Sequence, residues 1–185
     1  DRPDHFEIKC DSVLFSIVSW VKYGKPAYEA FAEHEFAFHF IARLFTTVFG
    51  TFLVPLTSLF TGELIRKSDL RYKKFIQLIS VIFVAFSPIF VQHSAYATPD
   101  VVLTFFVILF SYLQLKYFET GNLKVLVASV VCIGVGVTIK YPALILCVVT
   151  AAMHGNTLGI ISGALYGFSM IMVYTISSVY HGLSP

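Results

Sequence analysis

The residues best suited to chemistry are three charged side chains at the edges of apolar segments. Asp100 ends the polar stretch VQHSAYATPD, Arg43 lies within FHFIARLFTTVFG, and Lys140 closes GVTIK. An ionised side chain costs ~2.5–3.5 kcal/mol at the centre of a spanning helix on insertion scales and usually faces a bundle interior or a cavity. Two cations beside carboxylates suit a phosphate-bearing ligand, because the cations stabilise a leaving phosphate while a carboxylate accepts a proton.

Each of these residues also has a structural explanation. Thr98 can cap a helix, Pro99 fits its first turn, and Asp100 lies where the helix dipole favours negative charge. Arg43 could extend its side chain to the headgroups, and Lys140 could interact with the carboxyl end of its own helix. Convergence of several charged residues on one side of a membrane is what favours a site.

Two histidines and a tyrosine are predicted on the same side as Asp100. His39 and His93 could assist a metal or a proton transfer, although a lone histidine is more often a hydrogen-bonded structural residue. Tyr96 is expected to help line a sugar pocket. We therefore include all three as possible pocket residues.

The composition is that of a membrane protein. Hydrophobic residues make up 57% of the 185 and charged residues only 13%, against about 25% in soluble domains. The formal net charge of +2 is too small to suggest a nucleic-acid partner. Three widely spaced cysteines predict neither a disulfide framework nor a zinc site.

The elements that must position the charged residues are apolar blocks separated by short polar breaks. Since a spanning helix needs about 20 residues, they predict an all-α, polytopic transmembrane helical bundle with about five or six spans, as the N-terminal part of a longer chain. The block over 141–153 is short enough to be a re-entrant or partial span. The six blocks are 36–62, 75–92, 101–118, 123–139, 141–153 and 158–180.

The basic stretch ELIRKSDLRYKK fixes the expected orientation. The positive-inside rule places it in the cytoplasm, so residues 1–35, the HSAYATPD break, Lys140 and the tail over 181–185 fall outside. We therefore divide the chain into an extracytoplasmic first loop over 1–35, a transmembrane core over 36–180 and an outer tail. The expected location is a prokaryotic plasma (inner) membrane, with the site on its outer face.

The first loop carries seven acids against four bases. Its middle, DSVLFSIVSWVKYG, has serines on one helical face and aliphatic residues on the other, and predicts an interfacial helix that stops at Gly24. Asp4, His5 and Glu7 make an oxygen-rich divalent-metal site conceivable, but their spacing is not diagnostic. A metal requirement is left open.

The ordered set of motifs over about 36–150 resembles the membrane core of GT-C glycosyltransferases, nearest to the protein mannosyltransferase and aminoarabinose transferase branch. Arg43 matches an arginine in the first helix, Ser87 and Pro88 lead to the loop aspartate Asp100, and Lys140 closes a glycine-containing helix. The resemblance implies inverting transfer from a polyprenyl-phosphate sugar, with an aspartate of the first outer loop as catalytic base.

The family usually has an adjacent acidic pair in that loop, whereas this chain has RPDHFEIKCD. The base therefore stays open between Asp4, Glu7 and Asp11. Asp100 is expected to orient the acceptor or hold a metal. The implied partners are the lipid-linked donor, a glycan, protein or lipid acceptor, and membrane lipid.

Two rival functions fit some of the same sequence features. A transporter or flippase for a charged or lipid-linked solute would also place ions and glycine-interrupted helices in a membrane. It should show charges near mid-bilayer and inverted repeats, and neither is evident in the sequence. A structural subunit of a membrane complex would need no outer cluster of acids and bases.

Overall fold

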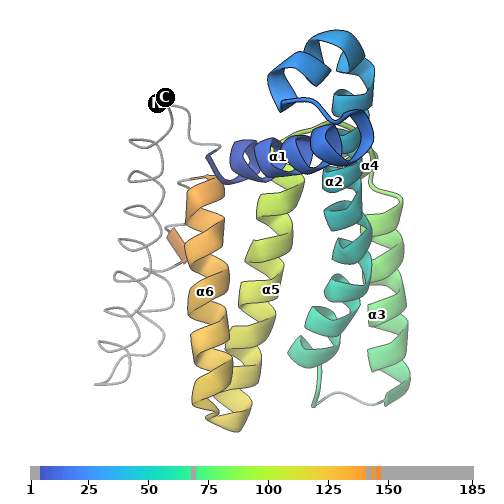
Figure 1. Cartoon of the computed structure of the whole chain (residues 1–185). Coiled ribbons are helices and arrows are strands. Elements are labelled where there is room, and N and C mark those ends of the chain that lie inside the picture. Colours follow the sequence, from blue (N-terminus) through green and yellow to red (C-terminus); the bar gives the residue numbers. More distant parts are fainter. Residues whose placement is uncertain (1–4, 68–69, 141–142, 144, 147–185) are drawn as a thin grey trace.

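The chain folds as a bundle of helices with further helices laid across one end (Figure 1). The structure is a computed structural model that describes residues 5–67, 70–140, 143 and 145–146. The predicted all-α membrane bundle is confirmed, and the apolar helices mark an integral membrane protein. In chain order the elements are α1 (His5–Val18), η1 (Ser19–Tyr23), α2 (Ala27–Leu64), α3 (Leu70–Ala85), α4 (Pro88–Ala95), α5 (Pro99–Thr120) and α6 (Leu123–Ile139).

Four upright segments correspond to the first four predicted blocks. α2 and α5 are long and apolar enough to cross a membrane, and α3 with α4 forms a third candidate span that is bent by 50°. α6 is a shorter apolar helix of 17 residues, with the predicted bounds of 123–139. The predicted block over 158–180 and most of the block over 141–153 lie outside the described residues.

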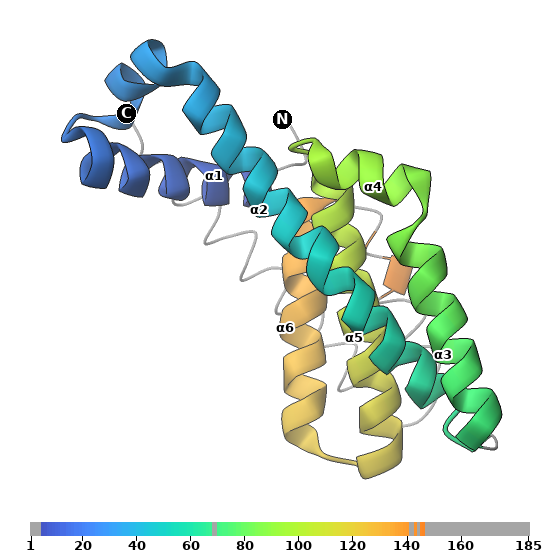
Figure 2. The same ribbon diagram turned by 90° about the vertical axis from the view of Figure 1, so that its right-hand side faces the viewer.

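The second predicted span is broken, which corrects the expectation of one continuous block over 75–92. α3 ends at Ala85, Ser87 adopts an extended conformation (φ −66°, ψ 116°), and Pro88 begins α4. Proline lacks a backbone N–H and disfavours the helical conformation of the preceding residue. The break turns α4 across the end of the bundle towards the start of α5 (Figure 2).

The predicted interfacial segment forms α1 and η1, which lie roughly at right angles to α5 and α6 in both views (Figures 1 and 2). Gly24 ends η1 in a left-handed conformation (φ 63°), as predicted. Trp20 is exposed. Ser19, expected on the polar face of this helix, is instead buried and its hydroxyl donates to the Lys25 carbonyl at 2.5 Å.

The core of the described bundle lies between α5 and α6. Phe110 of α5 packs with Val130, Ile133 and Val137 of α6. Between this cluster and the turn at Gly121, the buried Gln114 side-chain amide donates to the Ser129 hydroxyl at 2.8 Å. Hydrogen bonds between membrane helices are worth about 0.6–2 kcal/mol, so this one stabilises a particular alignment of α5 against α6.

Candidate functional site

The start of α5 and the end of α6 bring two of the predicted charged residues together. Because α5 and α6 are antiparallel neighbours joined by a turn at Gly121, the first turn of one lies beside the last turn of the other. Lys140 Nζ donates to Asp100 Oδ1 at 2.5 Å, and their side chains are 35% and 48% exposed. The ion pair is therefore accessible at the end of the bundle, where a ligand can reach both charges.

The loop before Asp100 is folded back onto α4. Pro99 occupies the first turn of α5, as predicted, and Asp100 follows it. Thr98 does not cap the helix through its side chain, contrary to the expectation; its hydroxyl donates to the His93 carbonyl at 3.3 Å. The Tyr96 N–H donates to the same carbonyl. These bonds fix the loop that carries Asp100 to the last turn of α4.

A cavity of about 300 Å³ lies between α4 and α5 beside the ion pair. Its polar lining includes His93 and Asp100. His93 Nδ1 is buried and makes no hydrogen bond within the described part of the chain. A buried nitrogen without a partner is uncommon in proteins and calls for a specific explanation. A polar group of a bound ligand would satisfy it.

Arg43 approaches this end of the bundle from α2. One turn further along the helix, the Thr47 hydroxyl is within hydrogen-bond distance of the Arg43 carbonyl (2.7 Å) and the Ser94 carbonyl of α4 (2.8 Å). A β-carbon added at Gly50 would lie 2.7 Å from Ser94 Cβ. Arg43, Thr47 and Gly50 lie within about 60° around the helix axis, so Arg43 belongs to the stripe of α2 that faces α4.

The Arg43 side chain is exposed and makes no ion pair with any residue in the described ranges. The structure thus pairs Asp100 with Lys140 and places Arg43 on the same side of the bundle without contact to that pair. The contacts of Thr47 and Gly50 with Ser94 were not foreseen from the sequence. The small residue at position 50 was the available signal for a close helix approach.

The remaining predicted pocket residues are more peripheral. His39 is exposed on α2, with its Nε2 3.3 Å from Glu35 Oε1. Tyr96 follows the last turn of α4, is 51% exposed and is not among the residues that line the cavity beside Asp100. The geometry therefore favours His93 over these two as a pocket residue.

The three candidate base residues of the first loop lie on or before α1. Asp4 is outside the described residues, and Glu7 falls in the first turn of α1. Burial raises the pKa of the Asp11 carboxyl above its usual value, and Asp11 Oδ1 has no hydrogen-bond partner in the described part of the chain. A carboxylate with a raised pKa has a greater affinity for a proton, which is the property that a general base requires.

No group of three histidine, cysteine or acidic side chains within the described residues is placed to hold a metal ion. The conceivable metal site at the start of the chain includes Asp4, which falls outside those residues.

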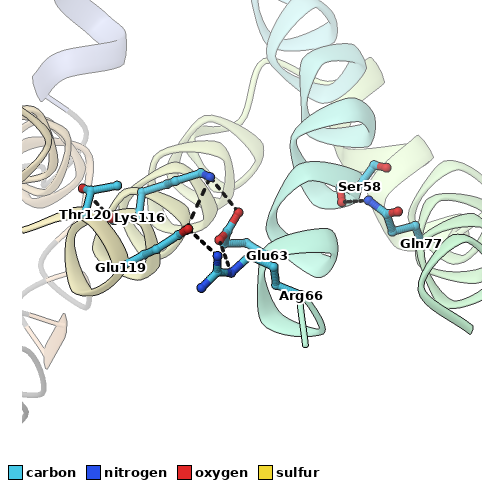
Figure 3. A network of polar contacts seen from close by, with 7 residues as sticks. All are labelled: Ser58, Glu63, Arg66, Gln77, Lys116, Glu119 and Thr120. Atoms are coloured by element: carbon cyan, nitrogen blue, oxygen red, sulfur yellow. Dashed lines mark hydrogen bonds and ion pairs between the residues drawn. The ribbon is translucent and has the colours of Figure 1, made fainter. Parts of the chain in front are cut away.

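The opposite end of the bundle holds a second set of charges, which we call the four-residue network: Glu63, Arg66, Lys116 and Glu119 (Figure 3). Lys116 Nζ lies 2.9 Å from Glu63 Oε2 and 3.7 Å from Glu119 Oε2, and Arg66 contacts both acids. Two acids and two bases from α2, the turn that follows it and α5 thus neutralise one another. Nearby, the Gln77 amide donates to the Ser58 carbonyl and joins α3 to α2.

One of the comparisons with known proteins extends over most of the chain. The pattern of the dolichyl-phosphate-mannose-protein mannosyltransferase family matches residues 14–175, a range that includes Arg43, Asp100 and Lys140. Hemolysin-3 of Bacillus cereus is 30% identical over 64 residues, which is 35% of this chain and 29% of that protein. The Hemolysin-3 homolog of Bacillus subtilis (strain 168) is 31% identical over 63 residues, which is 34% of this chain and 30% of that protein.

The chain therefore spans less than a third of the length of these two relatives. No solved structure matches. The family match, by contrast, takes in every helix from the middle of α1 onward and confirms the resemblance seen in the sequence. The chain belongs to the dolichyl-phosphate-mannose-protein mannosyltransferase family, whose members are membrane glycosyltransferases.

Proposed function

We propose that the protein transfers a sugar from a polyprenyl-phosphate donor to an acceptor on the extracytoplasmic face of the membrane, with inversion at the anomeric carbon. The observation that carries this proposal is the ion pair between Lys140 and Asp100, which joins the ends of two helices beside a cavity containing His93. The family membership supports a lipid-linked sugar as the donor.

In the proposed mechanism, the donor phosphate lies near Lys140 and Arg43. An acceptor hydroxyl or amine attacks the anomeric carbon, and the bond between that carbon and the phosphate oxygen breaks. The bonding electrons leave with the polyprenyl phosphate, whose growing negative charge the two cations stabilise. The partial exposure of the Lys140 ammonium group and its contact with Asp100 support this role for Lys140.

The acceptor proton passes to a carboxylate of the first segment. Asp4 is our first choice for this base, with Glu7 and Asp11 as alternatives. Asp100 would orient the acceptor and hold Lys140, while His93 would hydrogen-bond the sugar or phosphate through its buried Nδ1. Asp100 is not assigned as the base because its carboxylate already accepts a hydrogen bond from Lys140.

The test compares two lysines that each pair with a carboxylate, one at either end of α5 and α6. The full-length protein, reconstituted in liposomes with a polyprenyl-phosphate sugar, is assayed for transfer to acceptor peptides, glycans and lipids. We expect Lys140→Met to lower kcat/KM by about 10²–10³-fold, the size of a lost transition-state donor. Lys116→Met, in the four-residue network, should have the wild-type turnover when it is assayed well below its melting temperature.

Two outcomes would contradict the proposal. Equal turnover in the Lys140→Met and wild-type proteins would show that Lys140 does not stabilise the leaving phosphate. Translocation of the intact donor across the membrane, without sugar transfer to any acceptor, would instead indicate a flippase.

A further inference from the structure

Helix α3 has one face turned towards α2 and an opposite face turned away from the bundle. Two contacts define the inward face. The Gln77 amide donates to the Ser58 carbonyl of α2 (Figure 3), and a β-carbon added at Gly62 of α2 would lie 3.6 Å from Lys73 Cε. At about 100° of rotation per residue, Phe75 lies about 160° around the helix axis from both Lys73 and Gln77. The outward face of α3 is therefore centred on Phe75.

The outward face is apolar along most of its length. Phe75, Leu78 and Ile82 lie within about 60° of one another around the axis and are 60%, 57% and 47% exposed. We call these three residues the outer stripe of α3. None of the residues of α3 is buried within the described part of the chain. In a membrane, such a stripe lies against acyl chains or against another helix.

Basic side chains gather at the start of the outer stripe. Arg71 precedes Phe75 by one helical turn, and Lys74 lies about 100° from Phe75 around the axis. Lys67 lies in the turn before α3, and all three basic residues are exposed. Lys67 and Lys74 make no ion pair with any residue in the described ranges. The stripe therefore begins beside positive charge that its protein surroundings leave largely unmatched.

The acids at this end of the bundle are too few to neutralise these bases. The sequence over 63–74 holds five bases and two acids, and Glu63 and Glu119 are already engaged by the bases of the four-residue network. The positive-inside rule predicts that this end faces the cytoplasm. The cytoplasmic leaflet is rich in anionic lipids, which attract basic residues next to a membrane span.

We propose that Lys67, Arg71 and Lys74 bind the phosphate of an anionic phospholipid whose acyl chains lie along the outer stripe. A phospholipid joins an anionic headgroup to apolar chains, and α3 offers a basic start followed by an apolar stripe in the same order. A zwitterionic lipid fits less well, because its own ammonium group offsets the charge of its phosphate. The site lies at the opposite end of the bundle from Asp100 and Lys140, and it does not depend on the proposed function.

The experiment records which lipids touch the outer stripe. The full-length protein is placed in nanodiscs that contain equal amounts of phosphatidylglycerol and phosphatidylcholine with identical acyl chains. Benzoylphenylalanine, which bonds covalently to nearby C–H groups under ultraviolet light, replaces Phe75 in one preparation and Phe83 in the matched control. Phe83 lies on the same helix, is 77% exposed and is about two turns further from the basic residues. Mass spectrometry then counts the two kinds of lipid adduct.

We expect phosphatidylglycerol adducts to exceed phosphatidylcholine adducts about 5-fold or more at position 75, since each basic residue near a membrane surface contributes about this factor. At position 83 the two adducts should be equally frequent. Lys67→Gln combined with Lys74→Gln should bring the ratio at position 75 close to that at position 83. Lys22→Gln, which removes an exposed base from η1 at the other end, should leave the excess unchanged.

Three results would overturn the inference. The first is an equal ratio of the two lipids at positions 75 and 83, and the second is an excess that persists when both lysines are neutralised. The third is crosslinking of position 75 to protein alone, which would show that another helix or an acidic partner protein covers the outer stripe.

A second measurement does not depend on the folding of the lysine variants. With both lysines present, the excess at position 75 should shrink in about 1 M salt, where the Debye length falls to about 3 Å. An excess that is independent of the salt concentration would contradict recognition by charge.

Discussion

The charged side chains at the two ends of the bundle are arranged differently. In the four-residue network each acid contacts two bases, and Glu63 is only 11% exposed. At the other end the Lys140 and Asp100 side chains are 35% and 48% exposed, His93 Nδ1 lacks a partner among the described residues, and a cavity adjoins Asp100 and His93. Charges that neutralise one another in a poorly exposed network hold helices together, whereas an accessible ion pair and an unpartnered polar atom beside a cavity remain available to a ligand.

Exchanging the two charges of the accessible pair tests this distinction most strongly. The double variant Asp100→Lys with Lys140→Asp keeps an ion pair but reverses its direction, so the phosphate would meet a displaced cation. We expect near-normal thermal stability and a loss of transfer activity of about 10²–10³-fold. The measurements are a melting curve and a transfer assay on the same preparation. Wild-type activity in the exchanged protein would mean that the pair only holds α5 and α6 together.

The approach of α2 to α4 is the next feature to alter. Gly50→Ala would place a β-carbon 2.7 Å from Ser94 Cβ, so α4 and the attached loop must shift. We expect activity to fall about 10-fold, because a displacement of even 1 Å can cost more than this. Gly136→Ala is the matched control, since its β-carbon would meet Ala143 at an ordinary 3.5 Å. Equal activity in the two variants would argue against a positioning role for this contact.

The four-residue network can be broken by neutralising its least exposed acid. Glu63→Gln leaves Lys116 and Arg66 with one carboxylate between them, and removing one partner of a poorly exposed pair is destabilising. We expect Tm to fall by several degrees, about 5 °C, with little change in kcat at lower temperature. Differential scanning fluorimetry and the transfer assay measure these effects. A lowered kcat with an unchanged Tm would indicate that the four-residue network serves the reaction and does not hold the helices together.

The smallest expected effect concerns Asp11. Burial raises the pKa of its carboxyl in the folded protein, so ionisation of Asp11 opposes folding once the pH exceeds the pKa of the unfolded chain. Below that pKa the carboxyl is protonated in both states, and the opposing contribution disappears. Asp11→Asn should therefore raise Tm slightly at pH 7, by about 1–2 °C, with the difference vanishing near pH 3. A Tm difference that grows on acidification would contradict the assigned cause.

Local sequence signals predicted much of this architecture. Apolar length gave the bounds of α6, and the Thr-Pro-Asp signal gave the start of α5. The meeting of Asp100 and Lys140 was expected because alternating spans place both residues at the same end. These inferences depended on the length of apolar segments, on the conformational preferences of proline and on the distribution of basic residues, all of which can be read from short segments.

Contacts between distant segments could not be predicted in this way. Arg66 was assigned to a basic cytoplasmic cluster, yet it pairs with Glu119, and Glu63 pairs with Lys116. Thr47 and Ser94 meet because α2 and α4 cross, which depends on the bend at Pro88 and on the space left by Gly50. Such contacts require the rotation of each helix about its axis, and hydrophobicity alone does not specify this in a membrane, where the lipid-facing sides are apolar as well.

The hydrogen bond between Gln114 and Ser129 has a consequence for how the protein is assembled. Only a short turn separates α5 from α6, so the two can pair as soon as both have entered the bilayer, and sliding either by one turn would leave the Gln114 amide without its partner in hydrocarbon. The hairpin would then reach its final alignment early in biogenesis, bringing Asp100 and Lys140 together before any distant helix has docked. α2, which carries Arg43, would pack against this preformed hairpin last.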